Sequence, residues 1–360
     1  MVRLGDVCKK ASSNIAQKDL ACNEGEYPIY GASGFIKNVD FYKQDKQYIA
    51  IVKDGAGIGR AMILPSCSSV IGTLQYILPE KAVDVRYLYY AIASMNLAKY
   101  FSGATIPHIY FKDYQKELLP LPSQNKQIEI ADIFDSISEL ISLRKQQLEQ
   151  LDLLVKSMFV EMFGDLMTNP MGWEVYEFEK LCLLITDGEH ATPRRTNQGI
   201  YLLSARNILN HKIRLDDVDF IDEEEYNRIA RRVVPQENDI LISCSGSIGR
   251  CCRVPNDIKF QMVRSAALLR FKPMINPVFA EYLITSDDLQ RQIQQSATQS
   301  SQANLFQGKI RKLRAIVPHK ELQNEFADFV RQTDKSKFEI QQGLKQLELQ
   351  YNALMQQYFG

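Results

Sequence analysis

The segment 318–360 at the end of the chain repeats the segment 122–164 without a gap. Each matching residue pair stands 196 positions apart. The pairs are Pro122 and Pro318, Gln127 and Gln323, Ala131-Asp132 and Ala327-Asp328, Leu148 and Leu344, Leu151 and Leu347, and Phe163-Gly164 and Phe359-Gly360. A chain of 360 residues with such a repeat is constrained to be two copies of one structural unit.

The front part of each unit is variable. LGDVC at Leu4–Cys8 corresponds to FEKLC at Phe178–Cys182, 174 positions later, whereas the two Ile-Gly-Arg turns, at 58–60 and 248–250, stand 190 positions apart. Each unit therefore has a variable head and a tail of fixed length. This pattern favours a protein whose two heads recognise different targets on one shared frame. The alternative is a duplicated domain whose loops have diverged in the ordinary way.

Apolar residues in both tails follow a heptad pattern, with spacings of four and three that are typical of a coiled coil. The pattern predicts one helix of about 35 residues, about 50 Å long, in each tail. Arg144 interrupts the first pattern, and Thr333 and Lys337 are weak positions of the second. The predicted seam consists of Ile137, Ile141, Leu148, Leu151, Val155 and Met158 in the first tail and Ile340, Leu344, Leu347, Tyr351 and Leu354 in the second. The alternative is a core helix of a large bundle.

The heads have a mixed α/β pattern. Residues 46–52 and 238–243 are predicted as strands that lead into the glycine turns, and 70–79 and 263–273 as further strands that end at a proline. Residues 85–101 and 277–293 are predicted as helices. The expected fold class is α+β, with heads at 1–121 and 165–317 and helical tails at 122–164 and 318–360.

Enzymatic signatures are weak in this sequence. The stretch DGAGIGR at 54–60 lacks the last glycine of a dinucleotide-binding loop, and its glycines are expected to adopt positive φ between strands. The four histidines do not have metal-binding spacing, and Ser245 lies in Ser-Gly-Ser rather than in a nucleophile elbow. The stretch Asn169-Pro170-Met171-Gly172 only partly matches the motif of adenine methyltransferases. We therefore expect no catalytic residue, metal or cofactor in this chain.

The composition limits the cellular setting and the partners. No apolar run reaches the length of a membrane span, the N-terminus lacks a signal-peptide core, and the seven cysteines form no CxxC pair, so we expect a cytoplasmic protein with free thiols. The chain carries 43 basic and 43 acidic residues. Any positive face must therefore be local and offset by acidic surface elsewhere, such as residues 216–225.

The order and duplication of several motifs resemble the specificity subunit of type I restriction–modification systems over nearly the whole chain. The motifs are EYPIYGASG at 26–34, the two Ile-Gly-Arg turns, LPLPSQNKQIEIADIFDSI at 119–137, FGDLMTNPMGWE at 163–174, and DGEHATPRR with GIYLLSARNI within 187–208. Lys320 departs from the family pattern, and the chain is short for the family.

The resemblance implies two target recognition domains, joined by two antiparallel helices, that each read one half of a bipartite DNA site. It also implies methyltransferase and restriction subunits as partners, which would hold S-adenosylmethionine, ATP and Mg²⁺ and would perform base flipping and methyl transfer. Two alternatives are the specificity chain of a fused type II restriction–methylation enzyme and a coiled-coil scaffold that does not bind DNA.

Candidate DNA-contacting residues are polar side chains on loops and turns of the heads, where phosphates and base edges are commonly contacted. In the first head these are Lys53, Arg60, Gln75, His108 and Tyr110, and in the second head His190, Thr192, Arg194, Arg195, Ser204, Arg206, Asn207 and Arg250. Structural roles for the two turn arginines, a solvated loop around Arg194, and burial of Tyr110 and His108 are the competing interpretations.

Overall fold

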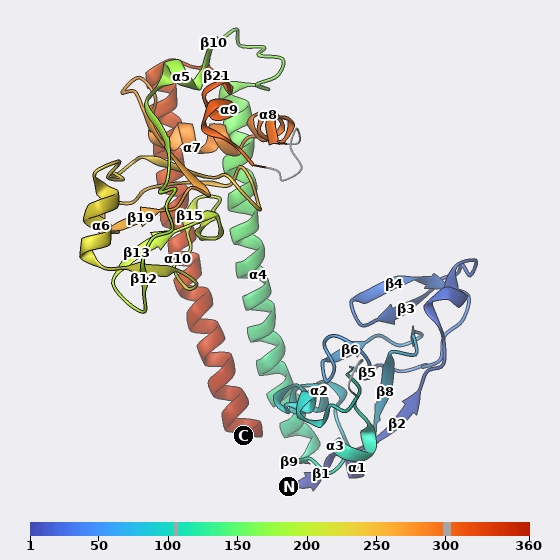
Figure 1. Cartoon of the computed structure of the whole chain (residues 1–360). Helices are drawn as coiled ribbons and strands as arrows, with labels where there is room; N and C mark the ends of the chain where they lie inside the picture. Colours follow the sequence, from blue (N-terminus) through green and yellow to red (C-terminus); the bar gives the residue numbers. More distant parts are fainter. Residues whose placement is uncertain (104–106, 298–303) are drawn as a thin grey trace. The chain divides into compact units, whose positions relative to one another are not determined.

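The computed structural model describes residues 1–103, 107–297 and 304–360 (Figure 1). The chain divides into two compact units. The first contains Met1–Gln147 and Ile340–Gly360, and the second contains Leu148–Glu339. Each unit thus combines one head with parts of both long helices.

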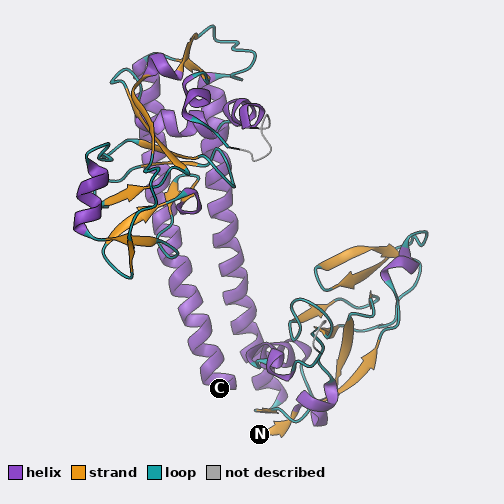
Figure 2. Ribbon diagram, in the orientation of Figure 1, coloured by secondary structure: helices purple, strands orange, loops and turns teal. Residues whose placement is uncertain are grey.

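The first head is built on two small sheets (Figure 2). A four-stranded antiparallel sheet has the order β2-β8-β5-β6, and a three-stranded sheet has the order β4-β3-β7. The strands are β1 (Val2–Arg3), β2 (Cys8–Ser12), β3 (Tyr27–Gly31), β4 (Gly34–Val39), β5 (Tyr48–Val52), β6 (Ala61–Leu64), β7 (Ser69–Val70), β8 (Leu74–Pro79) and β9 (Leu118–Leu119). The helices are α1 (Leu4–Val7), η1 (Gln17–Leu20), α2 (Val85–Ser94), η2 (Leu97–Tyr100) and α3 (Phe111–Tyr114).

The second head has the same plan with additions. Its central sheet has the order β11-β20-β17-β18, and a second sheet has the order β12-β16-β13-β19. The strands are β10 (Glu174–Glu177), β11 (Cys182–Asp187), β12 (Arg195–Thr196), β13 (Ile200–Leu203), β14 (Ile208–Leu209), β15 (Lys212–Ile213), β16 (Asp219–Ile221), β17 (Ile240–Ser243), β18 (Cys251–Arg253), β19 (Phe260–Met262), β20 (Ala266–Phe271) and β21 (Arg314–Val317). The helices are α5 (Phe178–Leu181), η3 (Ala205–Asn207), α6 (Glu223–Ala230), α7 (Pro277–Thr285), α8 (Asp287–Ala297) and α9 (Gln307–Arg311).

The sheet orders confirm the internal repeat. Strands β2, β8, β5 and β6 take the same places in the first head as β11, β20, β17 and β18 in the second. The parallel pair β3–β7 corresponds to the parallel pair β13–β19, and the antiparallel pair β1–β9 corresponds to β10–β21. The two heads therefore share a frame although their sequences differ.

The duplicated Ile-Gly-Arg turns link equivalent strands and need glycine for two reasons. Gly59 and Gly249 have φ of +82° and +88°, a region that residues with a side chain rarely adopt. A Cβ atom on Gly59 would also lie 2.9 Å from the Ala98 nitrogen, and one on Gly249 would lie 2.8 Å from Gln290 Oε1. The prediction that Gly55, Gly57 and Gly59 adopt positive φ is confirmed, and Gly249 does the same in the second head.

Replacing Gly59 by alanine should destabilise the first unit by at least about 1–3 kcal/mol, because positive φ and the contact with Ala98 both oppose a side chain. The matched control is Gly343→Ala, where an added Cβ meets nothing within 4 Å. That change should stabilise by about 0.4–1 kcal/mol. Urea unfolding followed by circular dichroism measures both, and equal effects of the two changes would contradict this account.

Two long helices, α4 (Gln124–Phe163) and α10 (Lys320–Phe359), each have 40 residues. Within the first unit, Phe134 of α4 packs on Tyr351 and Phe359 near the end of α10. Within the second unit, Phe326 near the start of α10 packs on Phe163 at the end of α4. The helices are therefore antiparallel, as the resemblance implied.

None of the predicted seam side chains is fully exposed. Ile137 and Val155 are buried, and the other nine predicted seam side chains are half-buried. The two weak heptad positions are also covered, since Thr333 is buried and Lys337 forms an ion pair of 2.6 Å with Asp152 of α4.

Equivalent glutamines attach each head to its helix. Gln127 Nε2 donates to the carbonyls of Ala82 and Pro122, and its Oε1 accepts from Asp84 N. In the second unit, Gln323 Nε2 donates to the carbonyls of Met274 and Pro318, and its Oε1 accepts from Asn276 N. Asp84 and Asn276 in turn cap the N-termini of α2 and α7 with their side chains, which are favourable residue types at this position.

The two predicted head helices are each broken, which corrects the sequence-based expectation. The first ends at Ser94 and resumes as the short η2, because Met95 and Asn96 leave the helical region. The second is divided at Ser286, which has an extended backbone and accepts a hydrogen bond from Leu289 N at the start of α8. The apolar spacing continues on both sides of the capping serine. The periodicity therefore did not reveal the break between the two helices.

Candidate nucleic-acid interface

A pocket of about 400 Å³ in the first head collects four of the five residues predicted there. It is lined by Lys10, Ser12, Lys53, Gln75, His108, Ile109, Tyr110, Phe111, Lys112 and Gln115. The fifth predicted residue, Arg60, is exposed on the glycine turn and does not line the pocket. Residues that are far apart in sequence thus form one site.

Backbone contacts hold the pocket walls together. Ser12 at the end of β2 pairs with Gln75 of β8, and Lys53 follows the adjacent strand β5. The segment before α3 is fastened to Lys53, because Ile109 N donates to the Lys53 carbonyl at 3.0 Å. This contact holds His108 and Tyr110, which flank Ile109, next to the end of β5.

The charged side chains of the pocket are lysines, and the buried Gln75 and Tyr114 next to them are neutral. Lys10, Lys53 and Lys112 supply positive charge, and no carboxylate is among the described residues that line it. Gln75 is buried and its Nε2 donates to the hydroxyl of Tyr114, whose pKa burial raises well above its usual value. The phenol therefore stays neutral beneath the lysines.

Asp54, on the glycine turn, is a carboxylate in contact with two residues of the pocket. It forms ion pairs with Lys53, at 3.7 Å, and with His108 Nδ1. The Lys112 ammonium lies 5.2 Å from the Tyr110 ring centroid, and this ring is 4.4 Å from the His108 ring. His108 and Tyr110 are half-buried and exposed, respectively, so both remain reachable from solvent.

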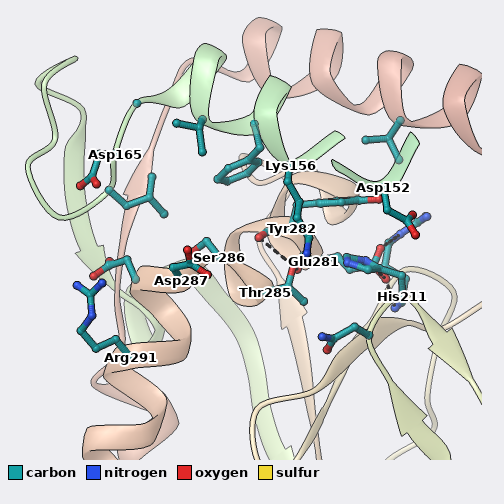
Figure 3. A pocket seen from close by; sticks show the side chains of 18 of the residues that line it. Asp152, Lys156, Asp165, His211, Glu281, Tyr282, Thr285, Ser286, Asp287 and Arg291 are labelled. Carbon is teal, nitrogen blue, oxygen red and sulfur yellow. Dashed lines mark hydrogen bonds and ion pairs between the residues drawn. The ribbon is translucent and has the colours of Figure 1, made fainter. Parts of the chain in front are cut away.

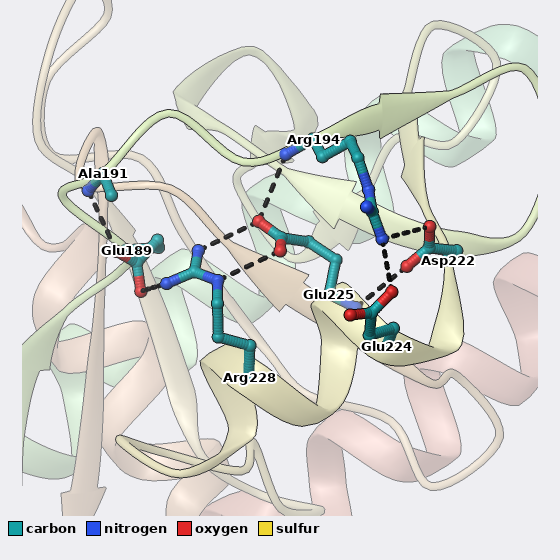
Figure 4. Close-up of polar contacts among 7 residues, drawn as sticks. All are labelled: Glu189, Ala191, Arg194, Asp222, Glu224, Glu225 and Arg228. Atoms are coloured by element: carbon teal, nitrogen blue, oxygen red, sulfur yellow. Dashed lines mark hydrogen bonds and ion pairs between the residues drawn. The ribbon is translucent and has the colours of Figure 1, made fainter.

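In the second head, three of the four predicted arginines, Arg194, Arg195 and Arg206, are paired with carboxylates, and Figure 4 shows the contacts of Arg194. Arg194 Nη2 lies 2.9 Å from Asp222 and 2.8 Å from Glu224. Arg195 and Arg206 each lie 3.0 Å from Asp219. The acidic residues expected to offset positive charge elsewhere instead lie against these arginines, which corrects that prediction.

The remaining predicted residues of the second head differ in accessibility. His190 is exposed and lies 2.8 Å from Asp187, and Thr192 is also exposed. Arg250 is half-buried at the second glycine turn. Ser204 is half-buried and donates to Asn207.

Asn207 is not available to a ligand. Its side chain is fully buried, its Nδ2 donates to the carbonyls of Arg214 and Asp217, and its Oδ1 accepts from Ser204 N. These three bonds satisfy the amide, so Asn207 holds its own loop, and we leave it out of the proposed interface.

A larger cleft of about 700 Å³ lies in the second unit, between α7 and parts of both long helices (Figure 3). Six carboxylates and four Lys or Arg side chains line it, so its charge does not suit a DNA backbone. Buried Glu281 accepts from Arg253 at 2.7 Å and lies 3.4 Å from His211. Burial raises the pKa of Glu281, but these contacts outweigh it and hold the pKa below its usual value. The cleft explains the weak heptad position Lys337, which faces it.

The described residues show neither a metal centre nor a membrane span. Within 1–103, 107–297 and 304–360, no three His, Cys, Asp or Glu side chains are grouped so that they could hold a metal ion. The helices in these ranges are not long and apolar enough to cross a bilayer.

Comparison with known proteins gives the family. The model of the type I restriction–modification DNA specificity domain matches residues 1–153 and again residues 170–349. The chain belongs to this family. Each match covers one head together with much of its helical tail, so the duplication seen in the sequence is a duplication of the specificity domain.

Relatives with this domain are distant in sequence. The MjaVIII specificity subunit of Methanocaldococcus jannaschii is 22% identical, over 93% of this chain and 85% of that protein. The EcoBI specificity subunit of Escherichia coli is 24% identical, over 70% of this chain and 59% of that protein. The crystal structure of the specificity subunit from M. genitalium has the same fold, with a TM-score of 0.65 at 14% identity, and the match covers 100% of this chain and 95% of that chain.

Sequence reasoning missed two lysines of this specificity-domain chain, Lys10 and Lys112. Lys10 is on β2 and Lys112 is on α3, and only the fold brings them to Lys53. The alternation along β2 was the available signal, because Lys9 and Lys10 must point to opposite faces of the strand.

Proposed function

We propose that this chain is the specificity subunit of a type I restriction–modification complex and that each head binds one half of a bipartite DNA target. The observation that carries the proposal is that the two heads share one backbone frame but have different surfaces. The two heads share sheet order, glycine turn and glutamine attachment. At their surfaces, one has a lysine-lined pocket and the other an arginine–carboxylate network. Two such heads can recognise different DNA half-sites with the same backbone geometry.

The long helices would place the catalytic subunits. Both helices carry exposed apolar side chains, which mark protein-binding surfaces when they cluster. These are Leu140, Leu143, Leu153, Leu154 and Val160 of α4 and Phe338 and Leu349 of α10. We propose that methyltransferase subunits dock on these surfaces and that restriction subunits join through them.

The chain itself would perform no chemistry. In this proposal S-adenosylmethionine, ATP and Mg²⁺ bind to the partner subunits, and the partner flips and methylates the adenine. Double-stranded DNA is the ligand of this chain, and the cytoplasm, where host DNA lies, is its compartment.

The decisive experiment maps methylated adenines across a host genome with and without this gene, in the presence of the methyltransferase partner. A two-part motif separated by a fixed spacer should disappear with the gene. Reintroduction of the intact gene should restore it. Persistence of the same motif without the gene would contradict the proposal.

The alternatives give different results. A coiled-coil scaffold would leave adenine methylation unchanged, and the methyltransferase would not copurify with it. The specificity chain of a fused type II enzyme would direct methylation through one polypeptide that carries both catalytic activities. Copurification of separate methyltransferase and restriction chains distinguishes that case from the proposal.

A further inference from the structure

Among the described residues of the second head, the positions equivalent to Lys10 and Lys53 do not carry lysine. Strand register makes the positions comparable, because Ser12 pairs with Gln75 in one head and Asp187 pairs with Ala267 in the other. By the same register Lys10 corresponds to Ile185, which is buried. Equivalent positions of the repeat are therefore cationic or polar in the first head and acidic or apolar in the second.

The position that follows the central strand differs in the same way. Lys53 follows β5, and buried Cys244 follows the equivalent strand β17. The second head is also covered there, since Gln307 Nε2 and Arg311 Nη2 both donate to the Ile185 carbonyl. The first head is open at this point, and the second is closed.

The chemistry of the open pocket suits a phosphate. Three ammonium groups come from β2, from the end of β5 and from α3, while the chain as a whole is neutral. Lys, Ser, Gln and Tyr side chains are common partners of DNA phosphates and sugars. The Tyr110 and His108 rings form an aromatic wall on one side, against which a sugar or a base can pack.

We propose that this pocket binds one phosphodiester of the target DNA, with Lys10, Lys53 and Lys112 around the phosphate and Tyr110 against the adjoining sugar. This rests on the proposed function. It assigns a backbone anchor to the first head that the second head lacks, so the two heads hold DNA by different means.

The test uses the full-length chain, a labelled duplex with the methylated motif and an unrelated duplex of equal length. The double variant Lys10→Gln/Lys112→Gln removes two exposed charges and leaves Lys53, which is paired with Asp54. Fluorescence anisotropy over a series of salt concentrations gives the slope of log K against log salt. The slope should become shallower by up to about 0.9, since the pocket neutralises one phosphate and each neutralised phosphate contributes about 0.9. Affinity at low salt should fall by a similar factor on both duplexes, because phosphate contacts carry no sequence information.

Lys9→Gln is the matched control. Lys9 adjoins Lys10 in the same strand, but it forms an ion pair of 2.7 Å with Glu80 and does not line the pocket. Its substitution should leave the slope unchanged. Equal urea midpoints for all variants would show that folding is intact, as expected for exposed side chains.

Three other outcomes have distinct meanings. An unchanged slope in the double variant would overturn the pocket assignment while DNA binding itself persists. Failure of the wild-type chain to bind either duplex would instead count against the proposed function. A thermal shift by adenosine monophosphate that is lost in the double variant, with an unchanged DNA slope, would assign the pocket to a free nucleotide and overturn the phosphodiester proposal.

Discussion

Replacing Phe134 by alanine should destabilise the first unit by about 3–5 kcal/mol, the usual cost of truncating a buried aromatic side chain. Phe134 is fully buried and lies at the centre of an aromatic cluster. Its ring centroid is 4.9 Å from that of Tyr90, 5.4 Å from that of Tyr351 and 5.8 Å from that of Phe359. Removing the ring leaves a cavity and loses the contacts of α4 with α2 and with α10.

Urea unfolding of the full chain measures this effect with two probes. Circular dichroism follows the whole chain, and fluorescence of Trp173, the single tryptophan, follows the second unit. Phe134→Ala should shift the dichroism transition to lower urea and leave the fluorescence midpoint in place. Leu140→Ala on the same helix is the control, because its side chain is 47% exposed, and it should change stability by no more than about 0.5 kcal/mol. Equal shifts for the two variants would contradict the central role of Phe134.

Replacing Gln323 by alanine should destabilise the second unit by about 1–3 kcal/mol. The change leaves the carbonyl of Pro318 without its partner in a buried bond, and an unsatisfied buried group costs about 1–3 kcal/mol; Asn276 N and the Met274 carbonyl, which are partly buried, also lose this partner. Gln323→Leu should lose a similar amount, because leucine fills the space but makes none of the three bonds. The Trp173 fluorescence midpoint is the measurement.

The repeat supplies the matched comparison. Gln127→Ala removes the same three bonds from the first unit, so its effect should appear in dichroism and not in Trp173 fluorescence. Gln332→Ala changes an exposed glutamine of α10 and should have little effect. If Gln323→Ala behaved like Gln332→Ala, the glutamine would not be what attaches the head to its helix.

Much of the frame could be predicted from the sequence, because it depends on local or repeated patterns. The heptads predicted both long helices, since a helix face is defined by residues three and four apart. The matching of Ile58-Gly59-Arg60 with residues 248–250 predicted equivalent turns, since positive φ selects glycine. Gln127 and Gln323 were matched in the repeat, but their role depends on carbonyls of a separate loop and could not be inferred from the helix pattern.

The surfaces of the heads could be predicted only in part. Lys53, Gln75, His108 and Tyr110 were named individually, and the fold brings them into one pocket. Lys10 was missed because its neighbours come from other elements. Arg194 and Arg195 of the second head were predicted to be available, but their carboxylate partners lie 24 to 30 residues further along the chain, at Asp219, Asp222 and Glu224. No local pattern reports such a pairing.

The first unit contains residues from both ends of the chain, and this affects its synthesis. Tyr351, Leu354, Met355, Tyr358 and Phe359 pack against the core of the first head. A ribosome that adds about 5–20 residues per second needs roughly 10–40 s to proceed from the end of the first tail to the end of the second. During that interval the buried aromatic residues of the nascent first head are not yet covered by these five residues of α10. We therefore expect the half-made chain to be a chaperone client, and the finished first head to form only after residues 351–359 have been synthesised.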